Sequence, residues 1–266
     1  MSRFLKIEFN RVFKSKSFLA ALALGVLIVL IQQITVARYY STAEENVFLY
    51  LTGYDTTGLG TNLYYLLLPC LVALAGADLL GEDRRSGLDI FSRIRGNDKQ
   101  YYFSKSIVAF IAGGVVFCLP LIMELCALML VYPSTPLDYF VAEVPVTYGA
   151  MFSNIFYNSP LTYELIFLVI GFAYGGLFAL IGILVSFFSS SKYVVLLSPL
   201  AIYYGVWIVF SLIGYPEFSP FGFLTPKQGY PLNFYIIWVE FLLLLVVIIM
   251  GIIWRVKNRK IIIWSG

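Results

Sequence analysis

The chain has 266 residues, of which 60% are hydrophobic and only 12% are charged, and its formal net charge is +3. A soluble domain carries about 25% charged residues. Here the apolar residues form runs long enough to cross about 30 Å of hydrocarbon, which excludes a soluble globular protein. The chain has no histidine, which also excludes Ser-His and Cys-His catalytic pairs and histidine metal sites.

The first sixteen residues are basic and amphipathic. Leu5, Phe9 and Val12 share one face of a helix, and most of the basic side chains lie opposite, although Glu8 falls toward the apolar face. This pattern predicts a helix that lies in the membrane interface. The alternative is a solvated basic tail that only fixes the topology.

Six apolar runs follow, and they predict an all-α membrane protein with six transmembrane helices. The predicted spans cover residues 17–37, 61–80, 106–132, 165–188, 193–215 and 232–254. The segments between them are too polar or too short to span. The longest of these connections covers residues 133–163, has no lysine or arginine, and contains a stretch, 141–156, that we expect to form an interfacial helix.

The most highly charged segment, residues 81–105, lies between the second and third spans. Its acidic residues come first and its basic residues last, which suits the dipole of a helix. Leu88, Phe91 and Ile94 form an apolar stripe, and Gly96-Asn97 is a helix stop signal. The segment therefore predicts a short amphipathic helix that begins near Glu82. The alternative is a solvated loop that only fixes the topology.

The basic residues are distributed unevenly between the two sides of the membrane. Sixteen lysines and arginines fall in the N-terminal segment, the 81–105 segment, the turn at Lys192 and the C-terminal tail, and only Arg38 and Lys227 fall in the opposite connections. By the positive-inside rule, both termini and the 81–105 segment are cytoplasmic, and the 133–163 connection is outside. We expect a multi-pass protein of the cell membrane.

Small residues repeat every four positions in the fourth span, at Gly171, Gly175 and Ala179. Such a row lets another helix approach closely. The partner helix belongs either to the same chain or to another copy, and the sequence leaves both open.

Two carboxylates, Glu124 and Glu240, lie well inside predicted spans. A buried carboxylate must pair, face water or take up a proton, because burying it alone costs several kcal/mol. Both residues are candidates for a substrate path. The alternative is a structural hydrogen bond between helices.

The chain lacks the signatures of common enzymes. It has no G-x-x-x-x-G-K-[ST] phosphate loop, no H-E-x-x-H and no G-x-S-x-G. Its cysteines, Cys70, Cys118 and Cys126, fall inside apolar runs and fit small buried hydrophobic residues. We therefore expect no enzymatic activity, no metal site and no nucleic-acid partner for this chain.

Taken together, the basic N-terminal segment, the six spans and the 81–105 connection resemble the permease subunit of an ABC-2 type ABC transporter. In that family the connection carries an acidic residue, a glycine, apolar residues, a turn and a lysine. Glu82 or Asp83 matches the acidic position, Gly87 the glycine, and Lys105 the lysine. Leu88 stands where threonine is common, and the turn lacks the usual proline.

The resemblance covers the whole chain, 1–266, as one transmembrane domain. It implies an exporter, a separate ATP-binding cassette ATPase that holds ATP and magnesium, and a second permease that is identical or related. No cofactor is expected in this chain. The residues implied in ATPase coupling are Glu82, Asp83, Arg84, Arg85, Gly87, Leu88, Phe91 and Arg95.

Two rival hypotheses remain. In the first, the chain is a stand-alone secondary transporter or channel that uses Glu124 and Glu240 as ion sites. Alternatively, it is an immunity protein that binds a peptide without transporting it, for which the acidic outer connection suits a cationic peptide.

Overall fold

The computed structural model describes residues 2–36, 45–76, 79, 83, 98–137, 145–189 and 191–262. These residues form helices and connections, and no strand occurs among them. The helices are α1 (Ser2–Phe13), α2 (Lys16–Thr35), α3 (Val47–Tyr50), α4 (Leu59–Gly76), α7 (Asp98–Met129), α8 (Ser153–Asn158), α9 (Pro160–Ser186), α10 (Lys192–Ile213), the 3₁₀ helix η1 (Pro216–Phe218), α11 (Pro220–Phe223) and α12 (Phe234–Ile262).

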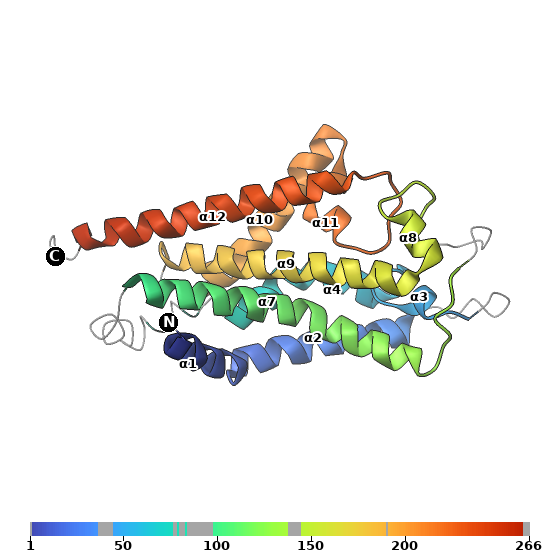
Figure 1. Ribbon diagram of the computed structural model, residues 1–266, viewed down its shortest axis with the longest axis horizontal. Coiled ribbons are helices and arrows are strands. Elements are labelled where there is room, and N and C mark those ends of the chain that lie inside the picture. The colour runs from blue at the N-terminus through green and yellow to red at the C-terminus, as the bar shows by residue number, and fades with distance from the viewer. Residues whose placement is uncertain are drawn as a thin grey trace.

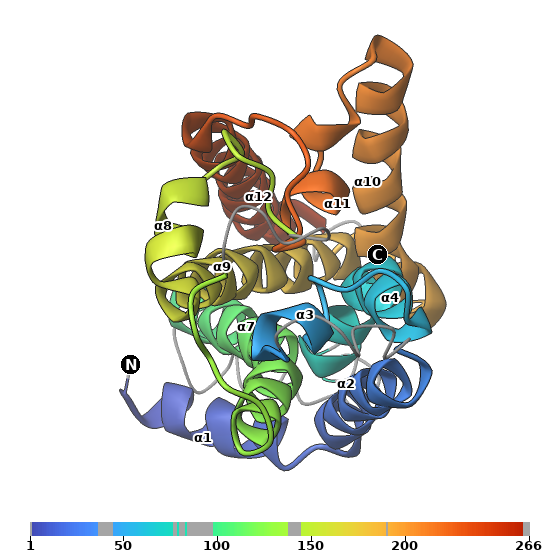
Figure 2. The ribbon, with the colours of Figure 1, turned by 90° about the vertical axis from the view of Figure 1, so that its right-hand side faces the viewer.

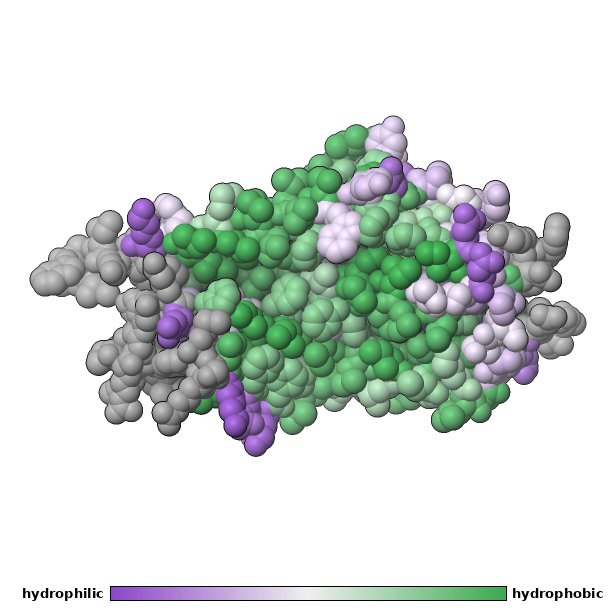
Figure 3. All heavy atoms as spheres, viewed as in Figure 1, coloured by the Kyte–Doolittle hydropathy of each residue, from purple (hydrophilic) through white to green (hydrophobic). Residues whose placement is uncertain are grey.

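Six of these helices, α2, α4, α7, α9, α10 and α12, are long and apolar enough to cross a membrane. The predicted all-α class with six spans is therefore confirmed within the described residues, and the architecture is that of a multi-pass membrane protein. On the face seen in Figure 3, apolar side chains cover the middle of the body and hydrophilic ones lie toward its two ends. This banding matches a bilayer, because lipid takes the place of water around the middle.

The helix boundaries differ from the predicted spans at several points. α7 begins at Asp98 rather than at 106, and α9 begins at Pro160 rather than at 165. Proline fits the first turn of a helix, where its missing N–H has no intrahelical partner. Hydropathy marks only the charge-free part of a helix, so the polar first turns were missed.

The expected interfacial helix over 141–156 is also wrong in its bounds. Within the described residues between 133 and 159, only α8 is helical, and it begins at Ser153 after Phe152 in a left-handed conformation (φ 59°). Residues 138–144 lie outside the described residues.

Both ends of the described chain lie at one end of the bundle (Figure 1). We call this the terminal end; it holds α1, the start of α7 and the end of α12. The opposite end, with α3, α8 and the connection 51–58, is the loop end. Viewed from the loop end, α9 lies at the centre, with α7 and α4 on one side and α10 and α12 on the other (Figure 2).

Small residues let α7 and α9 approach closely. A Cβ built on Gly175 would lie 2.9 Å from the carbonyl oxygen of Gly113, and one on Gly171 would overlap the ring of Phe117. A Cβ on Gly113 would in turn meet the methyl group of Ala179 at 2.8 Å. The predicted small-residue row thus faces α7 of the same chain.

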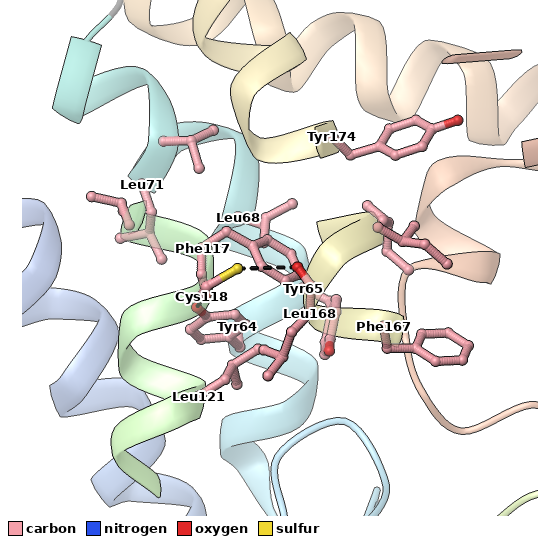
Figure 4. Packing of buried hydrophobic residues seen from close by; sticks show 14 of the residues in the cluster. Tyr64, Tyr65, Leu68, Leu71, Phe117, Cys118, Leu121, Phe167, Leu168 and Tyr174 are labelled. Atoms are coloured by element: carbon pink, nitrogen blue, oxygen red, sulfur yellow. Dashed lines mark hydrogen bonds between the residues drawn. The ribbon is translucent and has the colours of Figure 1, made fainter. Parts of the chain in front are cut away.

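Aromatic side chains fill the space around this contact. Tyr64 and Tyr65 of α4 lie among side chains of α7 and α9 (Figure 4), and both are almost fully buried. The Tyr64 hydroxyl donates to the Phe117 carbonyl at 2.5 Å, and the Cys118 thiol donates to the Leu168 carbonyl at 3.1 Å. The core therefore lies between α4, α7 and α9, whereas α10 and α12 expose many large apolar side chains, as lipid-facing helices do.

Candidate functional site

The first helix turns the carboxylate of Glu8 and the side chain of Val12 toward the bundle. Glu8 and Val12 are buried, whereas Ile7 is exposed. The Ser15 hydroxyl accepts a hydrogen bond from the Phe18 amide at 3.1 Å and so caps the start of α2. The chain thus turns from α1 into the first span at a fixed point. Glu8, which broke the amphipathic pattern, faces the bundle.

Glu8 meets a fully buried lysine at the terminal end of α7. Lys105 Nζ lies 3.2 Å from Glu8 Oε2 and 2.7 Å from Asp83 Oδ2, and Lys105 is 0% exposed. The ammonium also donates to the Leu79 carbonyl at 3.4 Å and lies 5.2 Å from the centre of the Tyr101 ring. Its charge is therefore held by two carboxylates, a carbonyl and an aromatic face.

Asp83 receives further donors from two helices. Arg11 of α1 forms an ion pair with it, and the Tyr101 hydroxyl of α7 donates to its second oxygen. Burial raises the pKa of the Asp83 carboxyl, but the Lys105 charge and the hydrogen bonds from Lys105, Tyr101 and Arg11 outweigh burial and lower that pKa below its usual value. Asp83 is therefore held in its ionised form.

We call Glu8, Arg11, Asp83, Tyr101 and Lys105 the charged cluster. Two carboxylates balance two basic groups, so the cluster is neutral as a whole. Removing one member of such a buried set costs about 3–5 kcal/mol, because it leaves a charge without compensation. The cluster joins α1, the residue at 83 and the start of α7 into one unit.

Asp83 is the one predicted coupling residue that the structure describes. The others lie outside the described residues; they are Glu82, Arg84, Arg85, Gly87, Leu88, Phe91 and Arg95. The predicted amphipathic helix over 82–95 therefore remains a prediction. Sequence reasoning treated Lys105 only as the end of the coupling segment, and it missed the pairing with Glu8.

Glu124, a predicted substrate-path residue, is held by hydrogen bonds at the loop end. It accepts from Gln33 Nε2 at 2.6 Å, from the Thr52 hydroxyl at 2.8 Å and from the Thr52 amide at 3.1 Å. These bonds tie α2, the connection 51–58 and α7 together. This arrangement favours the structural interpretation of Glu124.

Gln32 and Asp55, at the same end of the bundle, are also hydrogen-bonded. Gln32 donates to Asp55 Oδ2 at 2.9 Å and accepts from the Thr61 amide at 2.8 Å. Asp55 further accepts from the Gly58 amide at 3.0 Å and from Thr57. The connection 51–58 is therefore fastened to both α2 and α4.

Glu240, the other predicted substrate-path residue, lies on α12 beside Tyr174 of α9 and is only partly buried. Its Oε2 atom is enclosed and has no hydrogen-bond partner among the described atoms. Glu124 and Glu240 thus have different neighbours, and no described contact brings them together.

The chain was compared with protein-family models, curated proteins and solved structures. No protein-family model, no curated protein and no solved structure matches it.

Proposed function

We propose that the chain is the membrane-spanning permease subunit of an ATP-driven transporter, working with a separate ATP-binding cassette ATPase. Six helices of spanning length supply a membrane domain. The observation that carries the proposal is the charged cluster, which connects Asp83, at the start of the predicted coupling segment, to α1 and α7.

The cluster gives the coupling segment a firm attachment to the bundle. Glu8, Asp83 and Lys105 are buried, so pulling one of these charges away from the others would leave it without compensation. A displacement of the chain at Asp83 would therefore be passed to α1 through Arg11 and to α7 through Lys105 and Tyr101. Transmission of this kind is what an ATPase bound to residues 82–95 would need.

The proposal also covers orientation, direction of transport and partners. The terminal end faces the cytoplasm, as the distribution of basic residues predicts, and the chain works as an exporter with a second permease, identical or related, in the cell membrane. Glu124 holds the loop end together instead of lining the substrate path.

The test is purification of the tagged chain from its native host, followed by identification of the proteins bound to it. We expect a stoichiometric ATP-binding cassette ATPase. A charge-reversed variant, Arg84→Glu with Arg85→Glu, should lose the ATPase, because both residues lie in the predicted coupling helix.

Lys192→Glu is the matched control, since Lys192 is predicted on the same side but lies outside the coupling segment. It should retain the ATPase. A chain that purifies alone and transports an ion into liposomes without ATP would overturn the proposal in favour of a secondary transporter. A chain that purifies alone and only binds a cationic peptide would favour an immunity protein.

A further inference from the structure

A second carboxylate is buried at the loop end, near Glu124 but without its hydrogen bonds. Glu164 lies in the second turn of α9 and is 2% exposed. Its Oε2 atom has no hydrogen-bond partner among the described atoms. The span predicted from the sequence begins at 165 and leaves Glu164 outside, whereas α9 begins at Pro160 and includes it.

Two tyrosine hydroxyls lie beside this carboxylate, and that of Tyr54 is directed toward Glu164 as a hydrogen-bond partner. Tyr54 comes from the connection 51–58 and Tyr65 from α4; each is 2% exposed, and neither hydroxyl forms a hydrogen bond of ordinary geometry. Glu164 acts electrostatically on both. Burial, followed by the nearby Glu164 carboxylate, raises the pKa of the Tyr54 phenol, so this hydroxyl keeps its own proton.

The groups around Glu164 offer no positive charge. The described titratable groups on which it acts are Tyr54, Tyr65, Tyr163, Cys118 and Glu124. Lys227, the basic residue described in the loop-end connections, donates to the Thr56 hydroxyl at 2.8 Å and is exposed. Within the described residues, no lysine or arginine pairs with Glu164.

Aromatic rings pack against Tyr54 and Tyr163, which are neighbours of Glu164. Tyr54 and Tyr163 have ring centroids 6.3 Å apart, and Tyr163 and Phe156 have centroids 5.2 Å apart. The Tyr163 hydroxyl donates its hydrogen bond to the Pro226 carbonyl at 2.7 Å, so it does not donate to Glu164. An ionised carboxylate enclosed in this way would lack both water and a counter-charge, which costs several kcal/mol.

We propose that Glu164, with the hydroxyls of Tyr54 and Tyr65, is a proton-binding site at the loop end of the bundle. A proton on Oε2 removes the charge and turns that oxygen into a donor toward a tyrosine oxygen lone pair. Glu124 differs from Glu164 in that three hydrogen-bond donors surround its carboxylate. The site stands independently of the proposed transport function.

The direct test is infrared spectroscopy of the full-length chain in lipid nanodiscs at neutral pH. We expect the absorption of a buried neutral carboxylic acid in the wild type, its loss in Glu164→Gln, and its retention in Glu124→Gln. If the wild type lacks this absorption, or if Glu124→Gln removes it instead, the proposal is wrong.

A second test uses stability against pH. A carboxyl that binds its proton more tightly when folded stabilises the fold at low pH, and this contribution falls as pH rises above the value at which the unfolded group titrates. The unfolding equilibrium constant of the wild type should rise by up to about tenfold per pH unit relative to Glu164→Gln, the limit for one proton. Equal slopes in the two proteins would overturn the proposal.

Two further controls distinguish other occupants. Arg38→Gln removes the arginine that follows α2 in the sequence and lies outside the described residues. The acid absorption should be unchanged, and its appearance only in this variant would identify Arg38 as a counter-charge. Sodium or potassium chloride should not replace the proton, so stabilisation of the wild type but not of Glu164→Gln by either salt at fixed pH would contradict it.

If Glu164→Gln does not fold, Tyr54→Phe supplies the evidence, because removing the neighbouring hydroxyl should shift the acid absorption of the wild type. An absorption that this variant leaves in place would overturn the assignment to Glu164.

Discussion

The two ends of the bundle bury carboxylates in opposite ways. At the terminal end, Glu8 and Asp83 are balanced by Lys105 and Arg11. At the loop end, the described partners of Glu124 are neutral donors, and Glu164 has no described hydrogen-bond donor on Oε2. The comparison teaches that one residue type has three outcomes inside a membrane bundle: ion pairing, neutral hydrogen bonding, and uptake of a proton.

The largest effect is expected from removing Lys105, the cation between the two carboxylates of the terminal end. Lys105→Met should destabilise the fold by about 3–5 kcal/mol, because Glu8 and Asp83 would remain buried without it. Thermal unfolding in mild detergent measures the loss. Lys105→Met combined with Glu8→Gln and Asp83→Asn should recover part of the stability, since the two buried carboxylates are then neutral and the Arg11 side chain is 29% exposed to solvent. Equal losses in the single and triple variants would argue against a cost of charge.

Two substitutions at the loop end, Glu124→Gln and Glu164→Gln, compare the hydrogen-bonded carboxylate with the one proposed to bind a proton. Glu124→Gln places an amide before donors from Gln33 and Thr52, so it should cost about 2 kcal/mol. Glu164→Gln resembles the neutral acid and should cost less at neutral pH. Parallel thermal unfolding of the two variants checks the difference. If Glu164→Gln is the more damaging, the two carboxylates have been assigned the wrong way round.

Close contact between α7 and α9 holds the two ends in one body. Gly175→Ala should destabilise by about 1–3 kcal/mol, because the new Cβ would lie 2.9 Å from the Gly113 carbonyl oxygen. Gly205→Ala is the matched control on α10, where a Cβ meets nothing within 4 Å, and it should be neutral or slightly stabilising. Thermal unfolding of both variants decides whether the glycine is needed for packing.

Acid distinguishes the two ends through the change of stability with pH, which is a smaller effect than the loss of a whole side chain. Asp83 has its pKa lowered in the folded chain, so its stabilising contribution is complete above the pKa of the unfolded group, near about 4. That contribution is lost as pH falls through the lower folded pKa, whereas the Glu164 contribution increases toward low pH. Stability of the wild type and Asp83→Asn, measured at decreasing pH, should therefore converge below about pH 4.

The helices were predictable because apolar runs of sufficient length leave few alternatives in a membrane. The row at Gly171, Gly175 and Ala179 was equally visible, but its partner was not, because spacing within one helix does not identify the helix opposite.

The polar partners were much less predictable. Glu8 gave a signal, since it fell on the apolar face of an amphipathic segment, yet nothing in the sequence connects it to Lys105, 97 positions away. Glu164 gave none, because a polar first turn conceals a helix from hydropathy. Glu124 was found by its place in a span, but its role depends on Gln33 and Thr52, which only the folded chain brings to it.

The charged cluster also constrains how such a chain can change over generations. A substitution at Lys105 alone leaves the charged cluster with one uncompensated negative charge, so an accepted change there should be accompanied by changes at Glu8 or Asp83. Among related chains we therefore expect positions 8, 83 and 105 to vary together, as a set that is either charged throughout or neutral throughout.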